Sequence, residues 1–145
     1  MGLFDKFTSA KAVASFDNEQ DAYAAIMFAV MASDGEISRD EVTNTIATIT
    51  SKKLFAGREA DEVHLKVVQN LKKFKSIDEL LQAAITKISP EQKEPLFATL
   101  VDMVLTDGVV NLKEQQILEK LQESLSINND LATKIIEVLL IKNRG

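Results

Sequence analysis

The sequence Ala-Tyr-Ala-Ala-Ile-Met-Phe-Ala-Val-Met-Ala-Ser runs from Ala22 to Ser33 without a charged side chain. A helix that is apolar nearly all round is normally buried by its neighbours. The run is far shorter than the roughly 20 apolar residues that a membrane-spanning helix needs. Asp34 and Gly35 follow it directly, and Asp-Gly is a common turn pair. The stretch therefore predicts a buried central helix that ends at a turn.

A second segment repeats this arrangement. Leu96 to Thr106 has Asp102 as its only charged residue, and an Asp-Gly pair follows it. Shifting the sequence by 73 residues places the segment 31–41 on the segment 104–114. Both read D-G-x-[IV]-[SN]-x-x-E. The pattern predicts one helix–turn–helix unit that is used twice.

The remaining hydrophobic spacing is also helical, and no stretch alternates as a strand would. Ser or Asn followed three residues later by Glu or Gln indicates helix starts at Ser38, Ser76, Ser89 and Asn111. We therefore expect an all-α fold, a compact bundle of about seven helices with an internal helix–turn–helix pseudo-repeat. The predicted helices span residues 17–33, 38–50, 58–74, 77–88, 90–106, 112–125 and 129–142, with a short turn near Leu3–Phe7. The helices 17–33 and 90–106 should be buried together at the centre.

The composition limits the classes of function. A chain of 145 residues with 46% hydrophobic residues is typical of a single domain, here residues 1–145. It has no cysteine, which excludes disulfides and zinc–thiolate sites and fits a cytoplasmic location. The net charge is −5, with acidic residues concentrated in 17–41 and 91–119 and a basic stretch at 52–87. We expect neither a nucleic-acid partner nor a transmembrane segment.

The two Asp-Gly turns are the best functional signal. Their pattern is similar to the second half of an EF-hand loop, but the opening ligand positions hold apolar residues such as Val30 and Ala32. A working EF-hand is therefore excluded. Two interpretations remain, because helix caps explain Ser38 and Glu41 without any metal. They do not explain an Asp at a helix C-terminus, which opposes the helix dipole at a cost of about 0.3–1 kcal/mol.

The same residues resemble a known family. The segment Ala32-Ser33-Asp34-Gly35 with Glu41, the second copy Thr106-Asp107-Gly108 with Glu114, and the opening Leu3-Phe4-Asp5-Lys6 are similar to the TerB family of tellurite-resistance proteins. The resemblance covers about residues 20–127. It implies an all-helical fold, divalent-metal binding by acidic residues, and a place in bacterial stress systems beside membrane and calcium-binding partner proteins. It places metal ligands at Asp34, Glu41, Asp107 and Glu114, although Val109 and Leu112 make the second copy less acidic.

Two functions follow as alternatives. The first is a non-enzymatic stress-response module that binds calcium, magnesium or manganese rather than zinc, because every candidate ligand is an oxygen. If so, the turns 34–41 and 107–114 should form one acidic surface. The second is a protein–protein interaction scaffold whose turns are helix caps only. For either function, we expect any association with a membrane to come through a partner protein.

Other residue patterns in the sequence give little indication of a functional site. His64 is the only histidine, and we expect it at the rim of the core beside Val67 and Leu71. No Ser/His/Asp set and no glycine-rich phosphate loop is recognisable, so we expect no enzymatic activity. The last helix is broadly apolar from Ile135 to Ile141. It should either insert deeply or provide the face of a homodimer.

Overall fold

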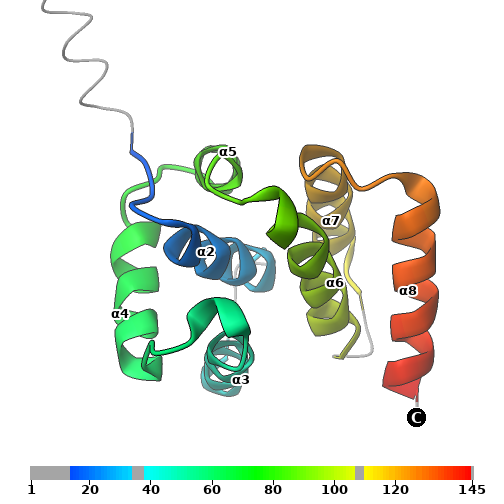
Figure 1. Cartoon of the computed structure of the whole chain (residues 1–145), viewed down its shortest axis with the longest axis horizontal. Helices are drawn as coiled ribbons and strands as arrows, with labels where there is room; N and C mark the ends of the chain where they lie inside the picture. Colours follow the sequence, from blue (N-terminus) through cyan, green and yellow to red (C-terminus); the bar gives the residue numbers. More distant parts are fainter. Residues whose placement is uncertain (1–13, 34–37, 107–109, 145) are drawn as a thin grey trace, which may run out of the picture.

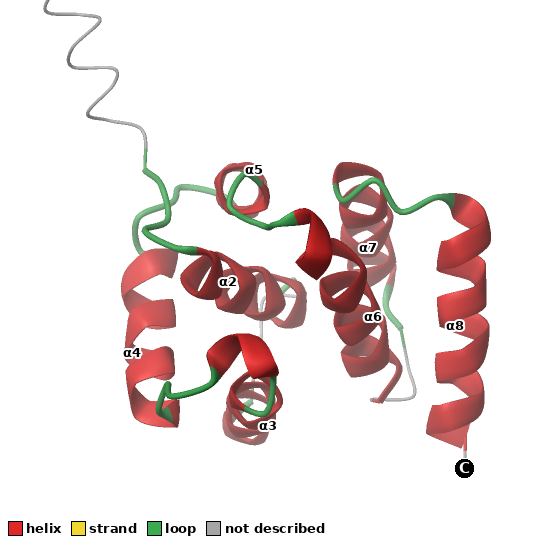
Figure 2. Ribbon diagram, viewed as in Figure 1, coloured by secondary structure: helices red, strands yellow, loops and turns green. Residues whose placement is uncertain are grey.

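The computed structural model describes residues 14–33, 38–106 and 110–144 (Figure 1). These residues form seven α-helices and one short 3₁₀ helix, and they contain no strand (Figure 2). The helices are α2 (Glu19–Met31), α3 (Arg39–Thr50), η1 (Lys53–Phe55), α4 (Ala60–Leu71), α5 (Ile77–Ile85), α6 (Pro90–Thr106), α7 (Leu112–Ser124) and α8 (Asn129–Arg144). The all-α prediction is confirmed. The short turn expected near Leu3–Phe7 lies outside the described residues.

Helix α2 is the centre of the molecule (Figure 1). It contacts α3, α4, α5, α6 and α7, and its residues from Asp21 to Met31 are all buried. The predicted partner helix α6 contributes Leu100 and Val101, which are 0% and 2% exposed. The expected burial of these two helices at the centre is therefore confirmed. Burying a large aliphatic side chain stabilises a fold by about 1.5–3 kcal/mol, so this pair of helices dominates the core.

Short polar side chains set the helix starts. Asn18 caps α2, with its side-chain oxygen accepting from the amide of Asp21 at 2.8 Å. This corrects the expectation that Asp17 would begin the helix. Ser76 caps α5 in the same way, and Asn128 accepts from the amide of Leu131 in the first turn of α8. Each cap satisfies an amide that has no partner within its own helix.

A buried ionic cluster ties the start of α2 to α4. The carboxylate of Asp21 is almost completely buried and lies 3.5 Å from the guanidinium of Arg58. The ammonium of Lys66 lies 3.8 Å from the same carboxylate and 3.6 Å from the exposed Asp17. Arg58 also contacts Glu62 at 2.7 Å. The cluster compensates the burial of Asp21, because a buried charge is tolerated only when it is paired.

The expected position of His64 at the core rim is wrong. Helix α4 buries Val63, Val67 and Asn70, which recur at the spacing of a single helical face. His64 lies on the adjoining face and is exposed, as is Leu65. The prediction placed the buried stripe one residue too far along the helix.

Helix α8 does not insert deeply. Ala132 is its one buried residue, while Leu131, Ile135 and Leu139 are partly buried against the core. The helix packs mainly on α6 at the edge of the molecule (Figure 1). Four large apolar side chains of α8 remain exposed: Ile136, Val138, Leu140 and Ile141.

Candidate functional site

The helices after the two Asp-Gly turns begin in the same way. At α3, the Ser38 hydroxyl accepts from the amide of Glu41 at 3.1 Å, and Oε1 of Glu41 accepts from the amide of Ser38 at 3.4 Å. At α7, the Asn111 side chain accepts from the amide of Glu114 at 2.8 Å, and Oε1 of Glu114 accepts in return at 3.3 Å. The capping boxes predicted at Ser38 and Asn111 are therefore confirmed. Ser76 makes only the bond that its hydroxyl accepts, and the amide of Ser89 donates to Glu19 instead of to Gln92.

Only two of the four predicted metal ligands can be placed. Glu41 is half-buried and Glu114 is buried, with 8% of its surface exposed. Asp34 and Asp107, with the glycines that follow them, lie outside the described residues. Within residues 14–33, 38–106 and 110–144, no group of three or more His, Asp or Glu side chains is arranged to hold a metal ion. The proposed ligand set therefore depends on the two aspartates.

Ser33, the residue just before Asp34, is a buried polar residue at the first turn. Its hydroxyl is buried and has no hydrogen-bond partner among the described residues. Buried hydroxyls are usually paired, because an unpaired one loses its hydrogen bonds to water without replacement. Its place at the first turn makes this hydroxyl a candidate for contact with a ligand.

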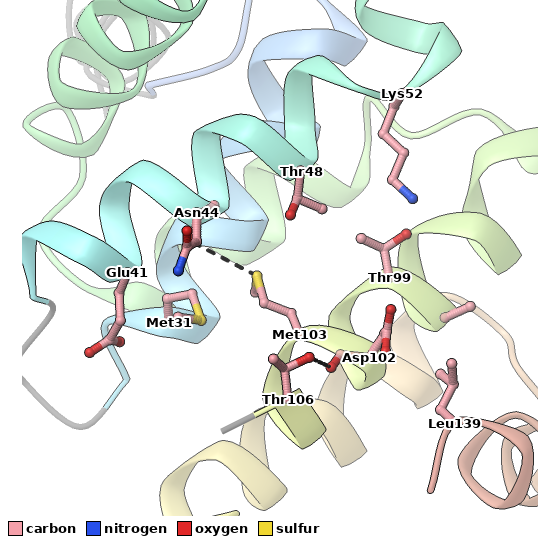
Figure 3. Close-up of a pocket in the computed structure, with 12 residues that line it drawn as sticks. Met31, Glu41, Asn44, Thr48, Lys52, Thr99, Asp102, Met103, Thr106 and Leu139 are labelled. Atoms are coloured by element: carbon pink, nitrogen blue, oxygen red, sulfur yellow. Dashed lines mark hydrogen bonds between the residues drawn. The ribbon is translucent and has the colours of Figure 1, made fainter. Parts of the chain in front are cut away.

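A cleft that sequence reasoning missed lies between α3 and α6 (Figure 3). Its volume is about 300 Å³, near the lower limit for small-molecule pockets. Helix α3 lines it with Glu41, Asn44, Thr45 and Thr48, and Lys52 lines it from just beyond the end of this helix. Helix α6 lines it with Ala98, Thr99, Asp102, Met103 and Thr106, and Met31 and Leu139 complete it. No local pattern could reveal this cleft, because its two walls are about 50 residues apart in the sequence.

The cleft brings the flanks of both turns together. Met31 ends the helix that precedes the first turn, and Glu41 closes that turn's capping box. Thr106 ends the helix that precedes the second turn. Figure 3 shows Glu41, Met31 and Thr106 at one end of the cleft. Glu114 does not line it.

Asp102 joins the cleft wall to α8. Its carboxylate accepts from Nζ of Lys142 at 3.0 and 3.1 Å and from the side-chain amide of Asn143 at 2.8 Å. Partial burial raises the pKa of Asp102, but the hydrogen bonds from Asn143 and Lys142 outweigh this effect, helped by the charges of Lys142 and Lys52. The pKa of Asp102 is therefore lowered below its ordinary value. Asp102 is partly exposed and is the one charged residue in the second half of α6, from Leu96 to Thr106.

A second hollow is apolar and lies among α6, α7 and α8. Its volume is also about 300 Å³. It is lined by Phe97, Val101, Val104, Leu105, Val110, Gln115, Leu118, Glu119, Gln122, Ile136 and Leu140. The exposed Ile136 and Leu140 of α8 form one of its edges. Exposed apolar surface of this kind is typical of interaction sites.

In the described part of the chain, none of the helices has the length and apolar character that crossing a membrane requires.

Comparison with known proteins finds one protein family whose sequence model matches the chain. The family model described as "Tellurite resistance protein TerB" matches residues 20–135, which include both Asp-Gly turns and all helices from α2 to the first half of α8. No curated protein and no solved structure gives a significant match. The match covers most of the chain, as the resemblance of the turn motifs had indicated. The chain belongs to the TerB family of tellurite-resistance proteins.

Proposed function

We propose that this chain is a non-enzymatic, cytoplasmic stress-response module that holds a divalent cation through Asp34, Glu41, Asp107 and Glu114. All of these ligands are carboxylates. Hard cations such as calcium, magnesium and manganese prefer oxygen ligands, whereas zinc sites in proteins usually include Cys or His. The module would act beside other proteins of a bacterial stress system, including membrane-bound ones.

One observation carries the proposal: Glu41 and Thr106 line the same cleft. Glu41 is the last residue of the first motif, and Thr106 directly precedes Asp107 of the second motif. This supports the idea that the two acidic turns lie close enough to share a ligand. Carboxylates gathered in one place repel each other, and a bound cation relieves that repulsion.

Two further features support a ligand at the turns. The buried hydroxyl of Ser33 has no partner among the described residues and adjoins Asp34. Glu114 is shielded from water by its burial, and shielding strengthens the attraction between a carboxylate and a cation. The capping bond engages Oε1 of Glu41, so capping by itself uses one oxygen of this carboxylate.

Isothermal titration calorimetry on chelator-treated protein tests the proposal with calcium, magnesium, manganese and zinc in turn. We expect saturable binding of one of the first three, together with a higher melting temperature. The variant Asp34→Asn/Asp107→Asn should lose both effects, and its apo form should melt higher than the wild type because repulsion is reduced. Asp61→Asn/Asp130→Asn is the matched control, since it removes two exposed carboxylates from other helices. Equal cation responses in both double variants would refute the site.

A scaffold without a metal is the second candidate, and the apolar surface of α8 favours it. Ile136, Val138, Leu140 and Ile141 are exposed, and two of them border the apolar hollow beside α7. A homodimer through α8, or a partner helix in the hollow, would cover this surface. Size-exclusion chromatography with light scattering tests the dimer. A dimer that becomes monomeric in Ile136→Ser/Leu140→Ser would support this function, and a wild-type monomer at high concentration would exclude the homodimer.

A further inference from the structure

The cleft between α3 and α6 has a wall of side-chain donors. Asn44 and Thr48 lie one helical turn apart on one face of α3, and Lys52 lies just beyond the end of this helix, where η1 begins. Figure 3 shows all three side chains at the cleft, facing Thr99, Asp102 and Met103 of α6. Helix α3 packs on α2 and α4 rather than closely on α6, which keeps the cleft open.

These donors lack partners in the described part of the chain. The amide of Asn44 and the hydroxyl of Thr48 make no hydrogen bond there, and the ammonium of Lys52 makes neither a hydrogen bond nor an ion pair. Lys52 is half-buried, and its side chain lines the cleft. A lysine in this position is an available counterion for a negatively charged group.

Thr45 gives an independent indication. This residue also lines the cleft, and it is 2% exposed. Its hydroxyl donates to the sulfur of Met103 at 4.0 Å, its one hydrogen bond in the described residues. A thioether is a weak acceptor, so a buried hydroxyl paired only with sulfur is poorly satisfied. An oxygen atom of a ligand in the cleft would be a better acceptor.

The charge around Lys52 is positive although the chain as a whole is acidic. Asp102 is the nearby carboxylate, and Lys142 and Asn143 already bind its two oxygens. Two lysines therefore stand against one acid at this end of the cleft. Glu41 lies in the first turn of α3, whereas Lys52 lies beyond its last residue, so most of the helix separates the two side chains. An anion at Lys52 would thus be separated from the acidic turns.

We propose that the cleft between α3 and α6 binds a small molecule bearing an oxyanion, a carboxylate or a phosphate, with Lys52 as its counterion and Thr45 and Thr48 as hydrogen-bond donors. Met103 and Ala98 supply an apolar surface for the rest of the molecule. The anion contacts Lys52, Thr45 and Thr48 are not among the proposed cation ligands, and Glu41 lines the other end of the same cleft.

Nuclear magnetic resonance titration of the ¹⁵N-labelled full chain tests the site. Inorganic phosphate and succinate are added separately in metal-depleted buffer at fixed ionic strength. We expect saturable shifts of the backbone amides in 44–52 and 98–106 for at least one anion. Saturation by phosphate alone identifies a phosphate ligand, and saturation by succinate alone identifies a carboxylate ligand. Saturation by neither, or shifts centred on other helices, would overturn the proposal.

Paired variants separate a specific site from general attraction. Lys52→Gln should weaken binding at least tenfold, whereas the neighbouring exposed Lys53→Gln removes the same charge outside the cleft and should weaken it less than twofold. Thr48→Val should weaken binding, and Thr43→Val on the exposed side of α3 should not. Equal losses in Lys52→Gln and Lys53→Gln would overturn the proposal. Asp34→Asn/Asp107→Asn should bind the anion normally, so this result does not depend on the fate of the cation proposal.

Discussion

Replacing Asp102 by Asn tests how α8 is held on α6. The substitution keeps a side-chain oxygen for Asn143 but removes the charge that attracts Lys142. The side chains of Asp102 and Lys142 are 33% and 60% exposed, so solvent screens their interaction. Partly exposed pairs of this kind contribute about 0.2–1 kcal/mol, and the two contacts to Lys142 place this pair near the upper end. We expect Asp102→Asn to lower the free energy of unfolding by about 0.5–1 kcal/mol at neutral pH.

The pH dependence of this loss identifies its cause. A carboxyl group whose pKa is lower in the folded state stabilises the fold above its unfolded-state pKa, and this contribution disappears as the pH falls through the folded-state value. The pKa of Asp102 is lowered, so wild type and Asp102→Asn should differ at pH 7 and converge in acid. Urea denaturation between pH 2 and 7 measures the difference. Asp78→Asn is the matched control, because its pair with Lys120 is more exposed and should contribute less. A difference that persists undiminished at pH 2 would refute the ionic explanation.

Three further substitutions test the fold. Burial raises the pKa of Tyr23 more than its hydrogen bond with Thr99 lowers it, so wild-type stability should fall above about pH 10. Tyr23→Phe should flatten that fall in urea midpoints between pH 8 and 11. Ser126 has a φ of 59°, so calorimetric melting should show stabilisation of about 0.5–1 kcal/mol in Ser126→Gly and destabilisation in Ser126→Val. Asp21→Asn should cost about 1.5–3 kcal/mol in chemical denaturation, because it removes the buried charge that faces Arg58 and Lys66. Asp17→Asn, at an exposed member of the same cluster, should cost little. A larger loss of stability in Asp17→Asn than in Asp21→Asn, or a more stable Ser126→Val than Ser126→Gly, would contradict these assignments.

Most of the fold could be predicted because its determinants are local. Caps such as Ser38 and Asn111 fix where helices begin, and long segments with at most one charged residue identify α2 and α6 as buried. Errors arose where the choice depended on neighbouring helices. Asn18 rather than Asp17 caps α2, and the 3₁₀ helix Lys53–Phe55 was not predicted.

The candidate sites were less accessible to sequence reasoning. The acidic turns are contiguous motifs, so their repetition could be recognised along the chain. The cleft is formed by side chains of α3 and α6 that become neighbours only through their common packing on α2. Lys52 lies in a basic stretch where one lysine resembles another in sequence. Its lack of an ion pair within the described residues is a property of the tertiary structure.

Glu41 has two assigned roles, helix cap and cation ligand, and one substitution separates them. The capping box requires an oxygen at Oε1 to accept from the amide of Ser38, and Gln supplies one. Glu41→Gln should therefore keep the cap and lose only the favourable charge at the start of α3, a cost of about 0.3–1 kcal/mol. Glu41→Ala loses the capping bond as well and should cost more.

Cation binding depends on the negative charge of residue 41 and not on its capping hydrogen bond. The variants Glu41→Gln and Glu41→Ala should therefore behave alike in titration calorimetry. If Glu41 is a ligand, both Glu41→Gln and Glu41→Ala should weaken cation binding relative to the wild type. They should differ from each other only in the melting temperature of the apo protein. Asp40→Asn removes a neighbouring charge at a position that the repeated motif leaves variable, and it should leave binding nearly unchanged. Full cation affinity in Glu41→Gln would make Glu41 a helix cap alone and would leave the two aspartates and Glu114 as the remaining carboxylates of the proposed site.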